Sequence, residues 1–255
     1  MKKICLSFGE NCITDNILDR YRIKSFSTPF SSARSNIEYI IGAEKDNYSK
    51  FLSLENIIYK YNGEKKLPYL CVYNELKNHY KEGHMNGFEF THHDVLNDPK
   101  ALKSYKRKIY RLLNLKNTHI FIFYFHRYSP ETNYGQLFDD LKELKNIYKK
   151  RGNNICQIIF FEQVIIDSCE RRIENQSNID LNIYRFYTNK IWEGDNPKYL
   201  FGLVDDDLIN EFICDVCKKY NIRKNFLIIW LLRKTKRKAL RFFKKIFARF
   251  KRYNK

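Results

Sequence analysis

The sequence predicts an α/β fold, in which a mostly parallel sheet is flanked by helices and a basic amphipathic helix follows at the C-terminus. Three observations lead to this prediction. Short apolar runs alternate with longer segments of helical spacing. The clearest runs, THIFIFYFH at 118–126 and NICQIIFF at 154–161, are apolar almost throughout, as in strands that are buried on both faces. Basic residues are concentrated near the C-terminus.

The elements follow in order along the chain. The predicted strands are short apolar runs, and they lie at 2–8, 118–126, 154–161 and, more weakly, 182–187. The predicted helices have apolar residues at three- and four-residue spacing, and they lie at 14–21, 35–60, 99–115, 135–150 and 205–220. Gly9 ends the first strand, and Pro99 opens the third helix.

Charge is distributed unevenly over the 255 residues, whose formal net charge is +18. Residues 221–255 contain fourteen Lys and Arg and no Asp or Glu, which leaves 33 basic and 29 acidic residues in 1–220. We therefore expect two parts, an α/β domain with a Cys-His site over 1–220 and a basic tail over 221–255. Basic tails of this kind bind acidic partners such as phospholipid or nucleic acid.

The tail FLIIWLLRKTKRKALRFFKKIFARFKRYNK favours a membrane partner. Its apolar residues have helical spacing with Lys and Arg between them, which is typical of a helix lying in a membrane interface. A continuous apolar stripe gains nothing from phosphate backbones, which argues against nucleic acid. The alternative is that the apolar face docks on the body of the protein. The residues expected to bind an anionic membrane surface are Trp230, Phe243, Lys244, Lys245, Phe247 and Phe250.

Cysteine usage and hydropathy indicate where the protein acts. Seven cysteines form an odd set without a disulfide framework, and several lie in apolar runs, so we expect reduced thiols inside the cell. The first apolar run is too short for a secretory signal, and the longest clean run, 226–232, is too short to span a membrane. We expect a cytoplasmic protein that is peripheral on the inner membrane face.

Cys12 is a candidate nucleophile because of its place in the predicted sheet. It follows the first strand and precedes the first helix, at the rim where reactive groups collect in open parallel sheets. A helix N-terminus favours a thiolate and can bind an oxyanion. Gly9 would permit a sharp turn there, and Asn11 would offer an amide donor beside the thiol. The alternative is a small buried residue in a tight turn.

Two strand ends supply a candidate base and a supporting acid. His126 ends the strand at 118–126, and Glu162 follows the strand at 154–161. In a parallel sheet, both side chains would project from the same rim as Cys12. A carboxylate beside the imidazole would hold the required tautomer and stabilise the charged form. The three residues are therefore a candidate catalytic group.

Four segments also resemble a known family. SFGENCITDNILDRYRIKSFSTPFSS at 7–32 resembles the opening of a bacterial family of unknown function called putative papain-like cysteine peptidases, with its S-L-G-x-N-C and S-x-P-F-D-W motifs. The later resemblances are FTHHD at 90–94 to its F-x-H-D segment, YKRKIYRLLNLKNTHIFIF at 105–123 to its basic helix and strand, and IWEGD at 191–195 to its W-x-G-D. The resemblance covers about residues 4–202.

The resemblance implies a thiol nucleophile at Cys12 and a histidine base at His93, with Asp94 beside it. It also implies a peptide or glycan substrate, because members of the family are often found in surface-polysaccharide gene clusters. This chain departs from the pattern where the family has Asp-Trp, since Ser31 and Ser32 stand there.

Three functions from different classes remain open. A Cys-His pair hydrolyses an amide in a cysteine peptidase, or passes an acyl group to a sugar hydroxyl in an acyltransferase that modifies a surface polysaccharide. The third function is that of a catalytically inert protein that binds membrane or nucleic acid. The pair Cys214 and Cys217 has no second pair and no nearby histidine, so we expect no metal site. No phosphate-binding glycine loop is present, and the sequence assigns no cofactor.

Overall fold

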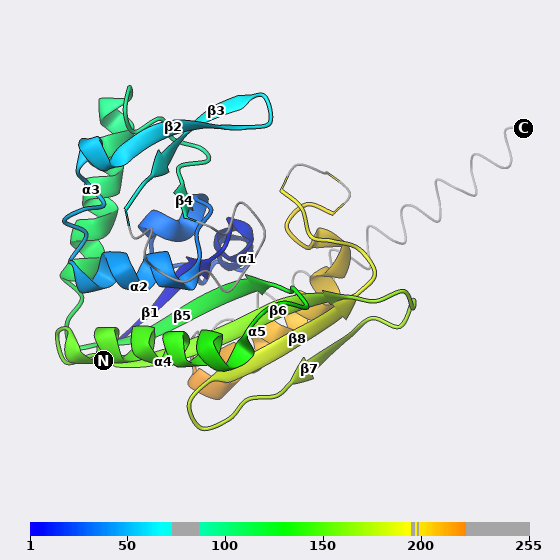
Figure 1. Cartoon of the computed structure of the whole chain (residues 1–255). Helices are drawn as coiled ribbons and strands as arrows, with labels where there is room; N and C mark the ends of the chain where they lie inside the picture. Colours follow the sequence, from blue (N-terminus) through cyan, green and yellow to red (C-terminus); the bar gives the residue numbers. More distant parts are fainter. Residues whose placement is uncertain (73–86, 195–196, 198, 223–255) are drawn as a thin grey trace, which may run out of the picture. The chain divides into compact units, whose positions relative to one another are not determined.

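The computed structural model describes residues 1–72, 87–194, 197 and 199–222 (Figure 1). The chain forms two compact units, residues 1–210 and 211–255, and each is described by itself. The elements in chain order are β1 (Lys2–Gly9), α1 (Ile13–Arg20), η1 (Pro29–Ser32), α2 (Ile37–Lys45), η2 (Leu54–Asn56), β2 (Ile57–Asn62), β3 (Lys65–Leu70), β4 (Phe88–Glu89), α3 (Pro99–Leu113), β5 (Thr118–Arg127), α4 (Tyr134–Lys150), β6 (Ile155–Ile165), β7 (Arg172–Asn175), β8 (Asn182–Thr188), η4 (Leu203–Asp205) and α5 (Asp206–Tyr220).

The first unit is built on a five-stranded sheet with the order β1-β5-β6-β8-β7 (Figure 1). The first four strands run parallel, and β7 pairs antiparallel with β8. This confirms the predicted α/β fold with a mostly parallel sheet. The four predicted strands correspond to β1, β5, β6 and β8. Strand β7 was not predicted, because its four residues RIEN lack an apolar run.

A hydrophobic core covers one face of this sheet. Successive side chains of a strand point to opposite faces, so Leu6 and Phe8 of β1 face the same side. They join a buried cluster with β5, β6 and the inward residues of α2, α3 and α4. Ser7 lies between them in sequence, and it bonds to Asp15 of α1 instead. Helix α1 therefore contacts the other side of β1.

A three-stranded antiparallel sheet, β2-β3-β4, occupies the region where the sequence suggested a longer helix. The helix expected over 35–60 is wrong beyond Lys45, where α2 ends. Asn47 and Tyr48 adopt left-handed backbone conformations that stop it, with φ of 52° and 63°. The β-branched and aromatic residues at 57–61 then form a hairpin through the turn at Gly63, a signal that the helical spacing concealed.

The second unit contributes only the end of α5, up to Tyr220, and residues 221–222 to the described part of the chain. The predicted basic amphipathic helix falls on residues that lie outside the described ranges, and so do Trp230 and the other expected membrane-binding residues. Across the described residues, no helix has both the length and the apolar character needed to cross a membrane.

Gly9 controls how β1 ends. Its φ is 125°, a backbone conformation that side chains rarely allow, and a Cβ placed there would lie 2.6 Å from the carbonyl oxygen of Phe125. Gly9 and Phe125 are register partners in the parallel pair of β1 and β5. The close approach of the two strands at this point therefore depends on the missing side chain.

We expect Gly9→Ala to lower the free energy of unfolding by roughly 2–4 kcal/mol, because it adds a backbone clash to an unfavourable dihedral angle. Urea unfolding followed by circular dichroism measures the change.

Gly63→Ala is the matched control, because Gly63 also has a positive φ, of 60°, but no atom lies within 4 Å of the added Cβ. Dihedral strain alone should cost about 1 kcal/mol there. Equal losses in the two variants would contradict the role given to the contact with Phe125.

Candidate functional site

The turn after β1 is held by a buried carboxylate. Glu10 is fully buried, and its Oε1 lies 2.5 Å from Nδ1 of His126. Its Oε2 accepts the backbone N–H of Arg127 at 2.7 Å. Burial of a carboxylate is costly unless it is paired and hydrogen-bonded, and both conditions are met here. These contacts fix the chain immediately before Asn11 and Cys12.

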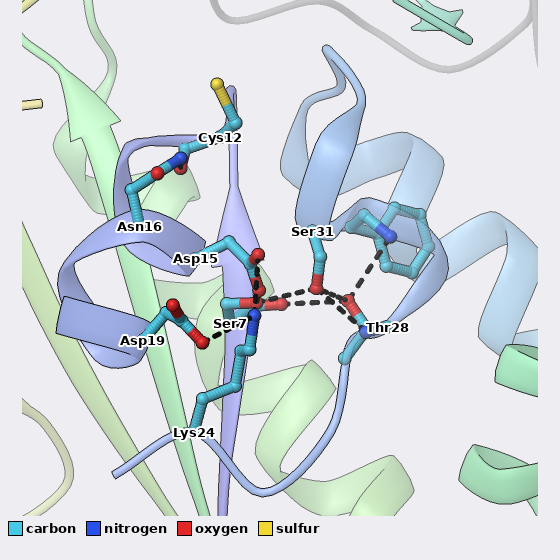
Figure 2. Close-up of polar contacts among 9 residues, drawn as sticks. Ser7, Cys12, Asp15, Asn16, Asp19, Lys24, Thr28 and Ser31 are labelled. Atoms are coloured by element: carbon cyan, nitrogen blue, oxygen red, sulfur yellow. Dashed lines mark hydrogen bonds and ion pairs between the residues drawn. The ribbon is translucent and has the colours of Figure 1, made fainter. Parts of the chain in front are cut away.

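Cys12 is the N-cap residue of α1 and is partly exposed (Figure 2). Its carbonyl oxygen accepts from the backbone N–H of Asn16 at 3.1 Å and from the Asn16 side-chain amide at 3.0 Å. The Oδ1 atom of Asn11 accepts the N–H of Ile13 at 2.9 Å, so the first turn of the helix is well ordered. The predicted position of Cys12 between a strand end and a helix start agrees with this structure.

Cys12 lines a cavity of about 670 Å³. The walls come from the start of α1, the segment after η1, the turn and strand of the β2-β3 hairpin, the end of β4, the end of β5 and the segment around Trp192. The lining residues are Asn11, Cys12, Ile13, Ala33, Arg34, Glu64, Lys65, Leu67, Glu89, Thr91, His92, Arg127, Ile191, Trp192, Glu193, Gly194 and Phe201. The volume lies within the range typical of ligand sites.

Glu89 forms the buried part of one cavity wall. Its side chain is fully buried, and it accepts hydrogen bonds from the Tyr69 hydroxyl at 2.6 Å and the Thr91 hydroxyl at 3.0 Å. The Arg34 guanidinium lies 3.9 Å from the same carboxylate. Burial and the neighbouring carboxylate raise the pKa of Tyr69. This wall is therefore polar, and its acid is already bonded to protein groups.

The two adjacent histidines of the FTHHD segment differ in position. His92 is exposed and lines the cavity with Cys12, whereas His93 does not line it. The ring of His93 is half-buried and meets the Tyr105 ring edge-on, with 5.6 Å between centroids. Burial, then the ammonium of Lys108, then His92 lower the pKa of His93. The structure therefore brings His92 to the thiol's cavity and packs His93 against α3.

Asp94 is engaged away from both histidine rings. Its carboxylate accepts hydrogen bonds from the Tyr59 hydroxyl at 2.7 Å and the Asn97 backbone N–H at 3.1 Å. Burial tends to raise the pKa of Asp94, but these hydrogen bonds outweigh it and hold that pKa below its usual value. Asp94 thus joins β2 to the loop before α3.

His126 and Glu162 are register partners on β5 and β6. Both lie inside their strands, because β5 continues to Arg127 and β6 to Ile165, so the prediction that Glu162 follows its strand is wrong. Each is nevertheless bonded elsewhere. His126 is fully buried between Glu10 and Thr132, with Nε2 at 3.0 Å from the threonine hydroxyl.

The partners of Glu162 come from other elements. Its carboxylate lies 2.5 Å from Nε of Arg185 and accepts from the Tyr134 hydroxyl at 2.7 Å. Neither His126 nor Glu162 is among the residues that line the cavity with Cys12.

Sequence reasoning did not assign roles to Arg34, Glu89, His92 and Arg127, all of which line the cavity. For His92 the sequence offered no signal that separates it from His93, because the two lie in a turn in which the His93 N–H donates to the Phe90 carbonyl oxygen at 3.2 Å. Arg34, Glu89 and Arg127 lie in short segments of the chain that contain no recognisable motif.

The described residues contain no group of three or more His, Cys, Asp or Glu side chains that could hold a metal ion. Comparison with known proteins gave one match. A model of the family described as putative papain-like cysteine peptidase, a domain of unknown function, matches residues 3–164. Neither a curated protein nor a solved structure matches the chain.

The pKa of the His93 ring should lie below the ordinary histidine value, because burial and the Lys108 ammonium both disfavour its protonation. Lys108→Met removes the ammonium but keeps the burial, so the pKa of His93 should rise without reaching its ordinary value. NMR titration of the histidine ring protons measures the shift.

Lys103→Met is the control, since Lys103 is an exposed residue of the same helix. It should leave the titration unchanged. An unchanged pKa of His93 in Lys108→Met would contradict the packing of His93 against α3.

Proposed function

Since the chain belongs to the family of putative papain-like cysteine peptidases, we propose that it is a thiol hydrolase whose nucleophile is Cys12. One observation carries the proposal. Cys12 stands at the start of α1 and shares a cavity of about 670 Å³ with an exposed imidazole, that of His92. Nucleophilic catalysis by cysteine requires a base that can come within hydrogen-bond reach of the thiol, and a shared cavity supports such an approach of His92 to Cys12.

The N-terminus of α1 supports this chemistry. The first N–H groups of a helix have no acceptor within the helix, and its N-terminal end carries a positive partial charge. Ile13 uses its N–H on Asn11, so Thr14 and Asp15 carry the other N–H groups of the first turn. A thiolate at Cys12 is favoured by this field, and so is the oxyanion that forms when the thiolate attacks a carbonyl.

The proposed reaction moves one proton through His92. The imidazole takes the proton of the Cys12 thiol, and the thiolate attacks the carbonyl carbon of an amide. The amine leaves with the proton from His92, and the acyl group remains on sulfur as a thioester. Water then hydrolyses the thioester, with His92 as the base, and restores the thiol.

A peptide is the substrate class that this cavity supports best. Lys65 of β3 and Glu89 of β4 make one wall polar and charged. Leu67, Ile191 and Phe201 add apolar surface to the cavity. Mixed lining of this kind suits the amide groups and side chains of a short peptide segment. The family description agrees with this substrate class.

Iodoacetamide labelling tests the roles of thiol and base. Cys12→Ser should remove the fast phase of labelling at neutral pH, because Cys12 is the cysteine that lines the cavity with His92. His92→Ala should slow that phase by about tenfold or more, because the thiolate loses its proton acceptor. Peptide mass spectrometry locates the label.

His93→Ala is the matched control, since it removes an adjacent imidazole that does not line the cavity. It should leave the fast phase within about twofold of the parent rate. Slowing by His93→Ala alone would assign the base to His93, as the motif resemblance implies. Fast labelling that persists in Cys12→Ser would overturn the proposal.

We also propose that residues 222–255 hold the protein on an anionic membrane surface at the cytoplasmic face. The support comes from the sequence alone, since residues 221–255 contain fourteen basic residues and no acid, with aromatic residues at helical spacing. Each basic residue near such a surface contributes about 1 kcal/mol.

Liposome flotation at moderate salt tests this membrane proposal. The full chain should float with anionic vesicles and stay at the bottom with neutral ones. Replacing both Lys244 and Lys245 by Glu keeps the aromatic residues but reverses two charges, so it should reduce the floating fraction strongly. Equal flotation of the full chain and of a chain ending at Tyr220 would contradict the membrane role of the tail.

A further inference from the structure

A row of polar contacts connects α1 to β1 and η1 (Figure 2). The hydroxyl of Ser7 donates to Oδ1 of Asp15 at 2.8 Å. Its oxygen lies 2.7 Å from the hydroxyl of Ser31, which also accepts the backbone N–H of Thr28 at 2.8 Å. Ser7, Thr28 and Ser31 are all buried. Ser31 is one of the two residues that stand where the family motif has Asp-Trp, and here its side chain is part of this row.

Counting protons gives the row a direction. A hydroxyl has one proton to donate, and Thr28 gives its own to the carbonyl oxygen of Ser7 at 2.8 Å. Ser7 gives its proton to Asp15, so the contact between the two serines uses the proton of Ser31. Asp15 is the acceptor at the end of the row. Such an arrangement fits an ionised carboxylate.

Lys24 completes the charge balance of Asp15. Its Nζ lies 3.1 Å from Oδ2 of Asp15 and 3.3 Å from Oδ1 of Asp19. The side chains of Asp15 and Lys24 are 16% and 19% exposed, whereas that of Asp19 is 72% exposed, so the inner pair is the less screened one. Burial by itself lowers the pKa of Lys24, but the two carboxylates outweigh it and raise that pKa.

Asp15 stands in the same helical turn as the thiol. Cys12 is the N-cap and Asp15 is the third residue of α1, a separation that puts side chains roughly 5–6 Å apart at Cβ. Figure 2 shows the sulfur of Cys12 directed away from the row, with Asp15 and Lys24 turned toward each other. An uncompensated carboxylate at this position would oppose the positive end of the helix, where the thiolate has to form.

We propose that Lys24 is a positioning residue for the reactive thiol. By pairing with Asp15, it cancels a negative charge in the first turn of α1 and leaves the positive field of the helix to act on Cys12. The inference rests on the proposed function, because it concerns the thiol that we assign as the nucleophile. It goes beyond that function by giving a role to two residues outside the cavity.

Other charges act on the same two groups. Lys108 of α3 is 8% exposed, with its Nζ 4.5 Å from the Tyr105 ring centroid, and its charge also interacts with Asp15. The thiol's cavity is further lined by His92 and by charged side chains of both signs, which are Arg34, Glu64, Lys65, Glu89, Arg127 and Glu193. All of these stay in place when only Asp15 and Lys24 are changed.

The test measures how fast iodoacetamide labels Cys12 across about pH 5 to 10, by mass spectrometry of the Cys12 peptide. Lys24→Met should raise the midpoint of this pH profile by about one unit, because Asp15 then loses its ion-paired ammonium and its negative charge acts more strongly on the thiolate. Asp15→Asn should lower the midpoint or leave it unchanged. In the variant with both substitutions, the midpoint should return close to that of the parent protein, although the ion pair is lost.

This pattern of signs separates charge balance from support of the fold. If the ion pair only held the helix, both single variants and the double variant would move the midpoint in the same direction, and that result would overturn the proposal. A midpoint unchanged by Lys24→Met would overturn it as well. Lys142→Met is the matched control, since it removes a lysine that is ion-paired at 3.0 Å to Asp139 on α4.

The proposed function fails separately. It fails if the fast phase of labelling persists in Cys12→Ser, whereas the effect of Lys24 on the Cys12 peptide can still be measured in the parent, because any thiol is labelled once the pH is high enough to ionise it.

Discussion

The contact between Gly9 and Phe125 is the constraint on which the candidate site depends. Strands β1 and β5 run in register up to this point, where only a residue without a side chain fits against the Phe125 carbonyl. The chain can then turn and bury Glu10 against His126. That buried pair fixes where Asn11 and Cys12 begin the helix. From this position the Cys12 thiol lines the cavity.

The two buried acids at the site, Glu10 and Glu89, are bonded to protein groups. Their carboxylates are therefore not available as reactive groups. Glu10 binds His126 and the Arg127 backbone, and Glu89 binds Tyr69 and Thr91. These carboxylates shape the walls, since breaking such a pair leaves a buried charge that costs several kcal/mol. A reactive group has to be accessible, and Cys12 with His92 meets that condition. We therefore propose the exposed His92, and not the buried His126, as the base for the partly exposed thiol of Cys12.

The sequence predicted the central sheet because its strands are short, apolar and separated by helices, as 118–126 and 154–161 show. It did not predict the β2-β3 hairpin, because the isoleucines of 35–60 suit a helix as well as a strand and only the turn at Gly63 decides between them. It placed His126 and Glu162 on two strands of one parallel sheet, where they are register partners, but it could not foresee that Glu10 would bind the imidazole. It could not separate His92 from His93, because their different positions depend on the turn at 90–93 and on the packing of the His93 ring against Tyr105 of α3.

Trapping of a covalent intermediate tests the central claim most directly. The protein is incubated with an activated peptide ester, and its intact mass is followed before and after digestion. A thiol hydrolase should gain the mass of one acyl group, on the peptide that contains Cys12, and Cys12→Ser should gain none. The adduct should decay as water hydrolyses the thioester. No adduct, or acyl groups spread over the other cysteines, would contradict the assignment of Cys12 as the nucleophile.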